Sequence, residues 1–122
     1  MGLADTPQEY LEDAPEVARP WLTEFWDHVR ERSPGLELTM FRSTPMFKFA
    51  DSYLKGYVMV TAAKGHVSGH AVDFDLVEEA KAAVPGSFGG KGCVSVKYAN
   101  EAAKPELESV VDNVLRRHGF LA

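Results

Sequence analysis

The chain has 122 residues, of which 45% are hydrophobic and 25% charged, and its formal net charge is −5. This length and composition indicate one soluble globular domain over residues 1–122 and exclude a disordered chain. No apolar run approaches the roughly 20 residues that cross a bilayer, so no association with a membrane is expected. A single cysteine, Cys93, and an N-terminus without a secretory pattern predict a cytoplasmic protein.

The acidic charge is concentrated at the N-terminal end. The first 31 residues contain eight acids against two arginines, a net of −6, whereas the remaining residues have a net of +1. Acids repel phosphate backbones, so nucleic acid is not expected as a partner. A cation or a basic protein is one interpretation of this charge, and a solvated helix surface is the other.

Two helices are predicted at the start of the chain. Thr6 has the character of an N-cap, with Pro7 at the first helical position and Glu9 completing a capping box, and Pro15 ends this helix. A second helix is predicted from about residue 16 to residue 32. Its buried stripe comprises Val17, Trp21, Leu22, Phe25 and Val29, with Trp26 at the margin.

A change to a period of two then predicts strands. They are expected at residues 36–41, 47–49, 53–62, 66–72 and 93–98, with a hairpin at residues 63–65. A capping box at Asp75 predicts a helix to about Ala83, a glycine-rich loop follows, and Pro105 opens a last helix that ends before Gly119. The order predicts an α+β fold, with an antiparallel β-sheet of about five strands packed by N-terminal, middle and C-terminal helices.

No catalytic motif is evident. His66 and His70 would lie about 13 Å apart on a regular strand, too far to share a metal ion unless Gly69 forms a bulge. The glycines at 86–92 lack the spacing of a phosphate-binding loop and lead into a strand. Cys93 has no neighbouring histidine in the sequence, so a buried thiol is favoured over a nucleophile. A binding protein is therefore favoured over an enzyme.

A basic and aromatic surface is a second candidate. Lysines on or beside the predicted strands alternate with Phe47, Phe49, Tyr53, Tyr57 and Tyr98. If they converge on the uncovered face of the sheet, they could bind an anionic ligand or an acidic partner. The candidate residues are Lys48, Lys64, His66, Lys91 and Lys97. Ordinary solvated lysines that discourage aggregation of strand edges are the alternative.

Short blocks in a fixed order resemble the YdhG-like family of bacterial domains of unknown function. The blocks are Glu9-Tyr10-Leu11, Thr44-Pro45-Met46-Phe47-Lys48-Phe49, Lys64-Gly65-His66-Val67 and Gly90-Lys91-Gly92, and together they cover nearly the whole chain. The resemblance implies an α+β fold that is frataxin-like in outline. It also implies a role as an iron chaperone, since one member is described as an intracellular iron chaperone for iron–sulfur and haem assembly.

In this chain, the counterpart of that role would be the acidic N-terminal helices. Glu9, Glu12, Asp13 and Glu16 are spaced so that neighbouring carboxylates can meet, although Pro15 interrupts the helix between the last two. Iron favours oxygen ligands, and an exposed site would bind it weakly enough to release it. The sequence thus predicts a non-enzymatic binding protein, either for iron destined for an iron–sulfur or haem assembly partner or for a ligand on the lysine-rich face.

Overall fold

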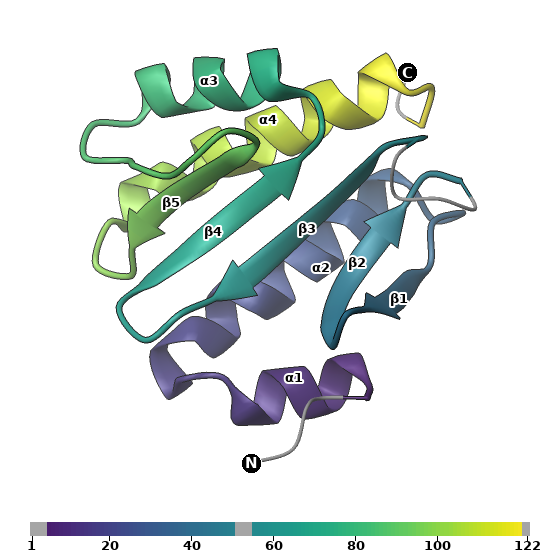
Figure 1. The fold of residues 1–122 in the computed structure, drawn as a ribbon, viewed down its shortest axis with the longest axis horizontal. Helices are drawn as coiled ribbons and strands as arrows, with labels where there is room; N and C mark the ends of the chain where they lie inside the picture. Colours follow the sequence, from purple (N-terminus) through teal and green to yellow (C-terminus); the bar gives the residue numbers. More distant parts are fainter. Residues whose placement is uncertain (1–4, 51–54, 121–122) are drawn as a thin grey trace.

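The computed structural model describes residues 5–50 and 55–120 (Figure 1). Within these residues a five-stranded antiparallel sheet has the strand order β1-β2-β3-β4-β5. The strands are β1 (Leu38–Phe41), β2 (Thr44–Lys48), β3 (Tyr57–Ala62), β4 (His66–Ala71) and β5 (Cys93–Lys97). The helices are α1 (Pro7–Asp13), α2 (Arg19–Arg32), α3 (Phe74–Ala83) and α4 (Lys104–Arg117), with short 3-10 turns η1 (Glu16–Ala18) and η3 (Glu101–Ala103). The predicted α+β class and the predicted sheet are confirmed.

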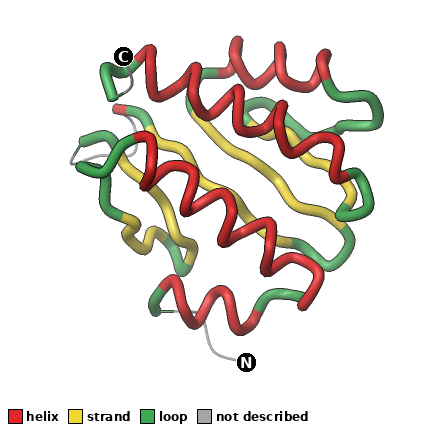
Figure 2. The backbone as a smooth tube through the Cα atoms, turned by 180° about the vertical axis from the view of Figure 1, so that it is seen from behind, coloured by secondary structure: helices red, strands yellow, loops and turns green. Residues whose placement is uncertain are grey.

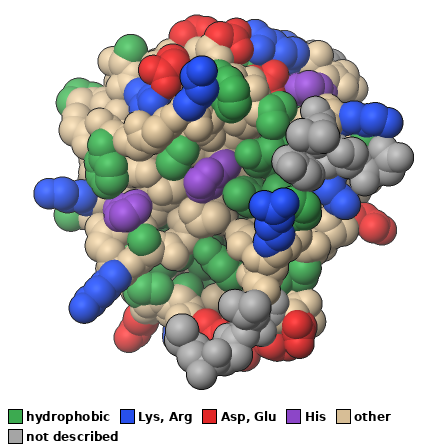
Figure 3. Space-filling model, viewed as in Figure 1, with side chains coloured by type: hydrophobic (Ala, Val, Ile, Leu, Met, Phe, Trp, Pro, Cys, Tyr) green, Lys and Arg blue, Asp and Glu red, His purple; other side chains and the backbone are tan. Residues whose placement is uncertain are grey.

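The helices are distributed unequally about the sheet. Figure 2 shows α2 and α4 lying across one face, and α3 packs against α4 and β5. The opposite face carries no helix among the described residues and is the face seen in Figure 3. Because neighbouring residues of a strand point to opposite faces, each strand contributes alternately to the core and to this open face. None of the described helices combines the length and the apolar character needed to cross a membrane.

The N-terminal helices form largely as predicted, with one shift. The Thr6 hydroxyl accepts a hydrogen bond from the Glu9 backbone N–H at 3.1 Å, and α1 ends before Pro15. The second helix begins only at Arg19, because η1 occupies the segment before it. A 3-10 turn has a tighter period than an α-helix, so the predicted burial of Val17 is wrong, and its side chain is 52% exposed.

The core is built by α2, α4 and the covered face of the sheet. On α2 it contains Trp21, Leu22 and Val29, as predicted, and also Trp26, which lies fully inside the core and not at its margin. Phe25 packs against this core but is only partly buried. From the sheet and α4, Phe47 and Leu115 are completely buried. A buried aromatic side chain removes about 150–250 Å² of surface from water, more than an aliphatic one.

Strand β2 starts earlier than predicted and contains Pro45. This residue pairs with Met40 of β1, whereas the pairing of β2 with β3 covers only Phe47 and Lys48. The missing N–H of proline is tolerated because no ladder with β3 forms at that position. At the far end of β3, the Ala62 N–H donates instead to the Tyr10 hydroxyl of α1 at 3.0 Å. The predicted start of this strand at Tyr53 lies outside the described residues.

Helix α3 begins two residues earlier than predicted. Its N-cap residue is Asp73, so the capping box expected at Asp75 is wrong. The Asp73 carboxylate makes no cap bond and instead accepts from Arg117 at 3.2 Å and contacts the His118 ring at 3.1 Å. The Asp73 carboxylate therefore contacts residues at the end of α4 and does not cap its own helix. The last helix is as predicted, with Gly119 at φ 84° just past its end.

Candidate functional site

The predicted lysine-rich surface is not gathered in one place. Lys48 pairs with Tyr57 at the start of β3, whereas Lys97 pairs with His66 near the opposite end of that strand. Because β3 is 6 residues long, these two ends lie about 17 Å apart along the sheet, in addition to the strands between them. Figure 3 accordingly shows basic side chains scattered over the open face.

The remaining members of the lysine set occupy separate places. Lys64 is exposed at the tip of the β3–β4 hairpin, close in sequence to His66, whose ring lies 5.2 Å from that of Phe88. The Lys91 ammonium lies 5.7 Å from the centre of the Phe74 ring, before β5. The structure thus brings His66 and Lys97 together but leaves Lys48 and Lys91 apart from them.

The four predicted iron ligands are all exposed. Glu9 belongs to the cap of α1, Glu12 accepts a hydrogen bond from the Gln8 amide at 3.2 Å, and Glu16 lies beyond the break at Pro15. Among residues 5–50 and 55–120, no three His, Cys, Asp or Glu side chains gather closely enough to hold a metal ion. Iron at Glu9, Glu12, Asp13 and Glu16 therefore stays a prediction that rests on the sequence.

An anaerobic Fe²⁺ titration followed by amide NMR tests that prediction. Saturable shifts at residues 9–16 that Mg²⁺ does not reproduce are expected if these acids bind iron specifically. Equal shifts with both ions would show only general attraction of cations to an acidic surface.

Cys93 has a histidine neighbour that the sequence did not reveal. The register of β4 and β5 places it directly opposite His70 on the open face. Each side chain is bonded elsewhere: the His70 ring lies 2.8 Å from the Thr61 hydroxyl, and the Cys93 thiol lies 3.4 Å from the Ser95 hydroxyl. Burial lowers the pKa of His70. Gly69 pairs regularly with Val60 and Val94, so the bulge that would bring His66 and His70 to one metal does not form.

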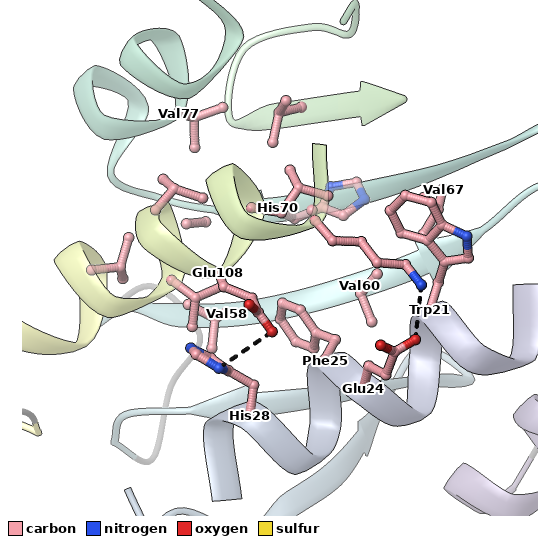
Figure 4. Close-up of a pocket in the computed structure, with 18 residues that line it drawn as sticks. Trp21, Glu24, Phe25, His28, Val58, Val60, Val67, His70, Val77 and Glu108 are labelled. Carbon is pink, nitrogen blue, oxygen red and sulfur yellow. Dashed lines mark hydrogen bonds and ion pairs between the residues drawn. The ribbon is translucent and has the colours of Figure 1, made fainter. Parts of the chain in front are cut away.

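An apolar crevice lies between α2 and α4, above β3 and β4. Its cavity has a volume of about 60 Å³. Figure 4 shows the residues of the crevice, which come from both helices and from the sheet beneath them. The lining is formed chiefly by Trp21, Phe25, Val58, Val60, Val67, Gly69, Ala71, Val94, Leu107, Val110, Val111 and Val114.

Small residues of β4 account for this crevice. The core-facing positions of β4 are Val67, Gly69 and Ala71, because they pair with core-facing residues of the neighbouring strands. Protein interiors are otherwise packed with few voids larger than a water molecule. At Gly69 a β-carbon would meet Val94 Cγ1 at 3.6 Å, an ordinary contact, so nothing in the backbone requires glycine there. The absent side chain leaves space beneath the two helices.

Polar and charged residues line the mouth of the crevice. We call Glu24 and His28 of α2, with Lys104 and Glu108 of α4, the rim. The Lys104 ammonium donates to Glu24 at 2.9 Å, and His28 Nδ1 lies 3.6 Å from Glu108 (Figure 4). The hydrogen bond from Lys104 to Glu24 raises the pKa of Lys104. The crevice therefore combines an apolar interior with a polar entrance, as small-molecule sites commonly do.

None of the rim residues was predicted from the sequence. A signal was present, because Glu24, His28 and Arg32 recur every four residues beside the apolar stripe of α2. Lys104, Glu108 and Asp112 recur in the same way on α4. Residues four apart lie on one side of a helix. What the sequence lacked was the information that these two rows face each other.

A second hollow lies near one predicted ligand residue. It is lined by Gly35, Leu36, Glu37, Thr39, Lys48, Phe49, Ala50 and Phe120, and its cavity volume is about 310 Å³. Gly35, Glu37 and Ala50 are exposed, so a ligand there would keep much of its hydration. The crevice, in which an apolar group would be withdrawn from water, is therefore the stronger candidate site.

Comparison with known proteins gives one informative match. No protein-family model and no curated protein matches the chain. Its structure is similar to the crystal structure of YdhG from Bacillus subtilis, a protein of the DUF1801 family, with a TM-score of 0.67 over 92% of this chain and 90% of that one. The chain has a YdhG-like fold.

This match confirms the fold expected from the sequence blocks. The sequence identity to YdhG is 14%, a level at which the likeness concerns the fold alone. Functions differ widely among proteins that share one fold, so the activity has to be argued from the site itself. In this YdhG-like domain, the crevice between α2 and α4 is the feature from which such an argument can start.

Proposed function

We propose that this YdhG-like domain is a small-ligand binding protein and that its site is the crevice between α2 and α4. The observation that carries the proposal is the cavity of about 60 Å³ with an apolar lining and a charged rim. An unfilled apolar space in a core costs stability, by roughly 24 cal/mol for each Å³ in a well-studied lysozyme series. A ligand that fills the space would recover part of that free energy.

The volume limits the size of the ligand. An engineered lysozyme cavity of about 150 Å³ binds benzene, which is about 25 Å³ for each carbon atom, and about 10–15 Å³ holds one water. On these two scales, a space of about 60 Å³ suits an apolar body of about two to four carbon atoms. Larger molecules would have to extend past the rim into solvent.

Titration with 1-butanol, followed by amide NMR, tests this function directly. Saturable shifts at Val60, Gly69 and Val111 are expected, because these residues line the crevice. Trp21 also lines it, so its fluorescence gives an independent signal. Shifts that are absent, or that rise linearly and spread over the whole surface, would overturn the proposal.

A larger side chain at Gly69 would fill the crevice and so tests whether butanol binds there. We expect Gly69→Val to abolish the butanol shifts, since its side chain would occupy the space above β4. Gly65→Ala, in the exposed hairpin where a β-carbon meets nothing within 4 Å, is the control and should leave binding unchanged.

Gly69→Ala should raise stability. A glycine inside a strand is less favourable than alanine by roughly 0.5–1 kcal/mol, and the new β-carbon meets no close neighbour. Urea unfolding should therefore show a free energy of unfolding increased by about that amount. A decrease would mean that the added β-carbon does not fit beneath the two helices, and it would contradict the unfilled space at Gly69.

A further inference from the structure

Two rows of polar and charged residues face each other between α2 and α4, and part of each row lines the mouth of the crevice. On α2 the row comprises Glu24, His28 and Arg32, and on α4 it comprises Lys104, Glu108 and Asp112. Glu24 pairs with Lys104 at 2.9 Å, His28 with Asp112 at 2.8 Å, and Arg32 with Asp112 at 3.5 Å. The pairs advance together along both helices, so α2 and α4 run in the same direction, as Figure 1 shows.

The two rows hold three carboxylates against one lysine, one arginine and one histidine. Lys104 is shared between Glu24 and Glu101, at 2.9 and 3.2 Å. His28 is shared between Asp112 and Glu108, and its 3.6 Å separation from Glu108 exceeds a hydrogen bond. The Glu108 carboxylate, whose side chain is 47% exposed, thus retains capacity to accept from a ligand. At the mouth, the two carboxylates of Glu24 and Glu108 exceed the single ammonium of Lys104, and such a surplus favours a positive ligand.

The chain itself already places one alkylammonium group at this mouth. Lys104 lines the crevice, and its ammonium lies 4.8 Å from the centre of the Trp21 ring as well as beside Glu24. An aromatic face and a carboxylate together form a favourable environment for such a cation. Phe25 and Glu108 line the crevice from facing helices one turn further along (Figure 4). They offer the same two kinds of group to a second ammonium.

Resting on the proposed function, we infer that the crevice selects a small organic amine. Its body of about two to four carbons would lie over Gly69, and its ammonium would donate to the Glu108 carboxylate beside the Phe25 ring. A carboxylate ligand would instead face Glu24 and Glu108, and like charges repel. A neutral alcohol of equal size could also donate its hydroxyl to Glu108, but it would lack the attraction between opposite charges.

A matched series of probes tests this inference on the whole chain. We would titrate 1-butylamine, 1-butanol and butyrate at neutral pH and low salt, and compare their dissociation constants from amide shifts at Gly69 and Val60. The amine should bind about three- to tenfold more tightly than the alcohol, and butyrate more weakly than either. Added salt should reduce the preference because the rim is partly exposed.

Two variants test whether the preference for the amine depends on Glu108. Glu108→Gln should bring the affinity for the amine close to that for the alcohol, because the affinity for the alcohol should change much less. Glu106→Gln removes the same charge from an exposed position of α4 outside the crevice, so it should retain the preference. Equal effects of the two variants would show attraction by net charge alone and would overturn the inference.

The two proposals fail in different ways. If butanol binds saturably at Gly69 and the amine binds no better, the selection of amines is overturned and the binding function stands. If none of the three probes gives saturable shifts in the crevice, the binding function itself is overturned, and the inference with it.

Discussion

Phe47→Ala will lower the free energy of unfolding by about 3–5 kcal/mol, the cost typical of removing a large buried aromatic side chain. Phe47 is completely buried in β2 and pairs with Val58 of β3, at the place where β2 and β3 are joined. The loss has two parts, the transfer free energy of the ring and the cavity left among neighbours that relax only partly. Since small domains have a total stability of about 5–15 kcal/mol, this variant should be close to unfolding at 37 °C.

The measurement is urea unfolding followed by the fluorescence of Trp21 and Trp26. Phe74→Ala is the matched control, because Phe74 is 44% exposed at the start of α3. It should cost less than about 1 kcal/mol, in line with surface substitutions. Equal losses for the two variants would contradict the burial of Phe47 described here.

Asp73→Ala is expected to lower the free energy of unfolding by about 2 kcal/mol. The Asp73 side chain is 6% exposed and accepts from Arg117, besides contacting the His118 ring at 3.1 Å. Hydrogen bonds to charged groups contribute roughly 1.5–3 kcal/mol. The exposure of Arg117 reduces the expected loss, because water can solvate its guanidinium group after the change. The helix cap itself should survive, since Asp73 makes no side-chain cap bond.

Asp75 provides the control on the same arginine. Arg117 forms two hydrogen bonds with this carboxylate, at 2.8 and 2.7 Å, but the Asp75 side chain is 60% exposed. Asp75→Asn should therefore be milder than Asp73→Ala in the same urea experiment. If Asp75→Asn proved the more damaging, the exposed pair would be the main link between α3 and α4.

Acid unfolding should report the Asp75 pair separately. The hydrogen bond from Arg117 lowers the pKa of Asp75 to about 2, below its ordinary value of 3.8. A carboxyl group whose pKa is depressed by folding stabilises the folded state above its unfolded pKa and loses that contribution as it is protonated. The contribution of Asp75 should thus fall between about pH 4 and pH 2. Asp75→Asn should flatten the dependence of unfolding on pH in that window, and an unchanged slope would contradict the pair.

Several features could be predicted from local sequence because their causes are local. Thr6, Pro7 and Glu9 define the start of α1 within four residues of chain, and the structure has that cap. The alternation of apolar residues predicted β3 and β4, and the short turn between them predicted a hairpin. The resemblance of the sequence blocks to YdhG-like domains was also followed by the structural match to YdhG. Errors occurred at Val17 and Asp75, where a neighbouring turn or a distant partner changed the local outcome.

The candidate site could not be predicted from the sequence, and the reason is physical. The crevice requires Gly69 of β4 to lie beneath two helices that are about 80 residues apart in the chain, as the pair of Glu24 and Lys104 shows. The facing of His70 and Cys93 likewise depends on the register of two strands. Periodicity and capping act over one or two turns, so the sequence by itself determined the elements and their order. Which faces meet was decided only by packing in the tertiary structure, where burial joins residues regardless of their separation in the chain.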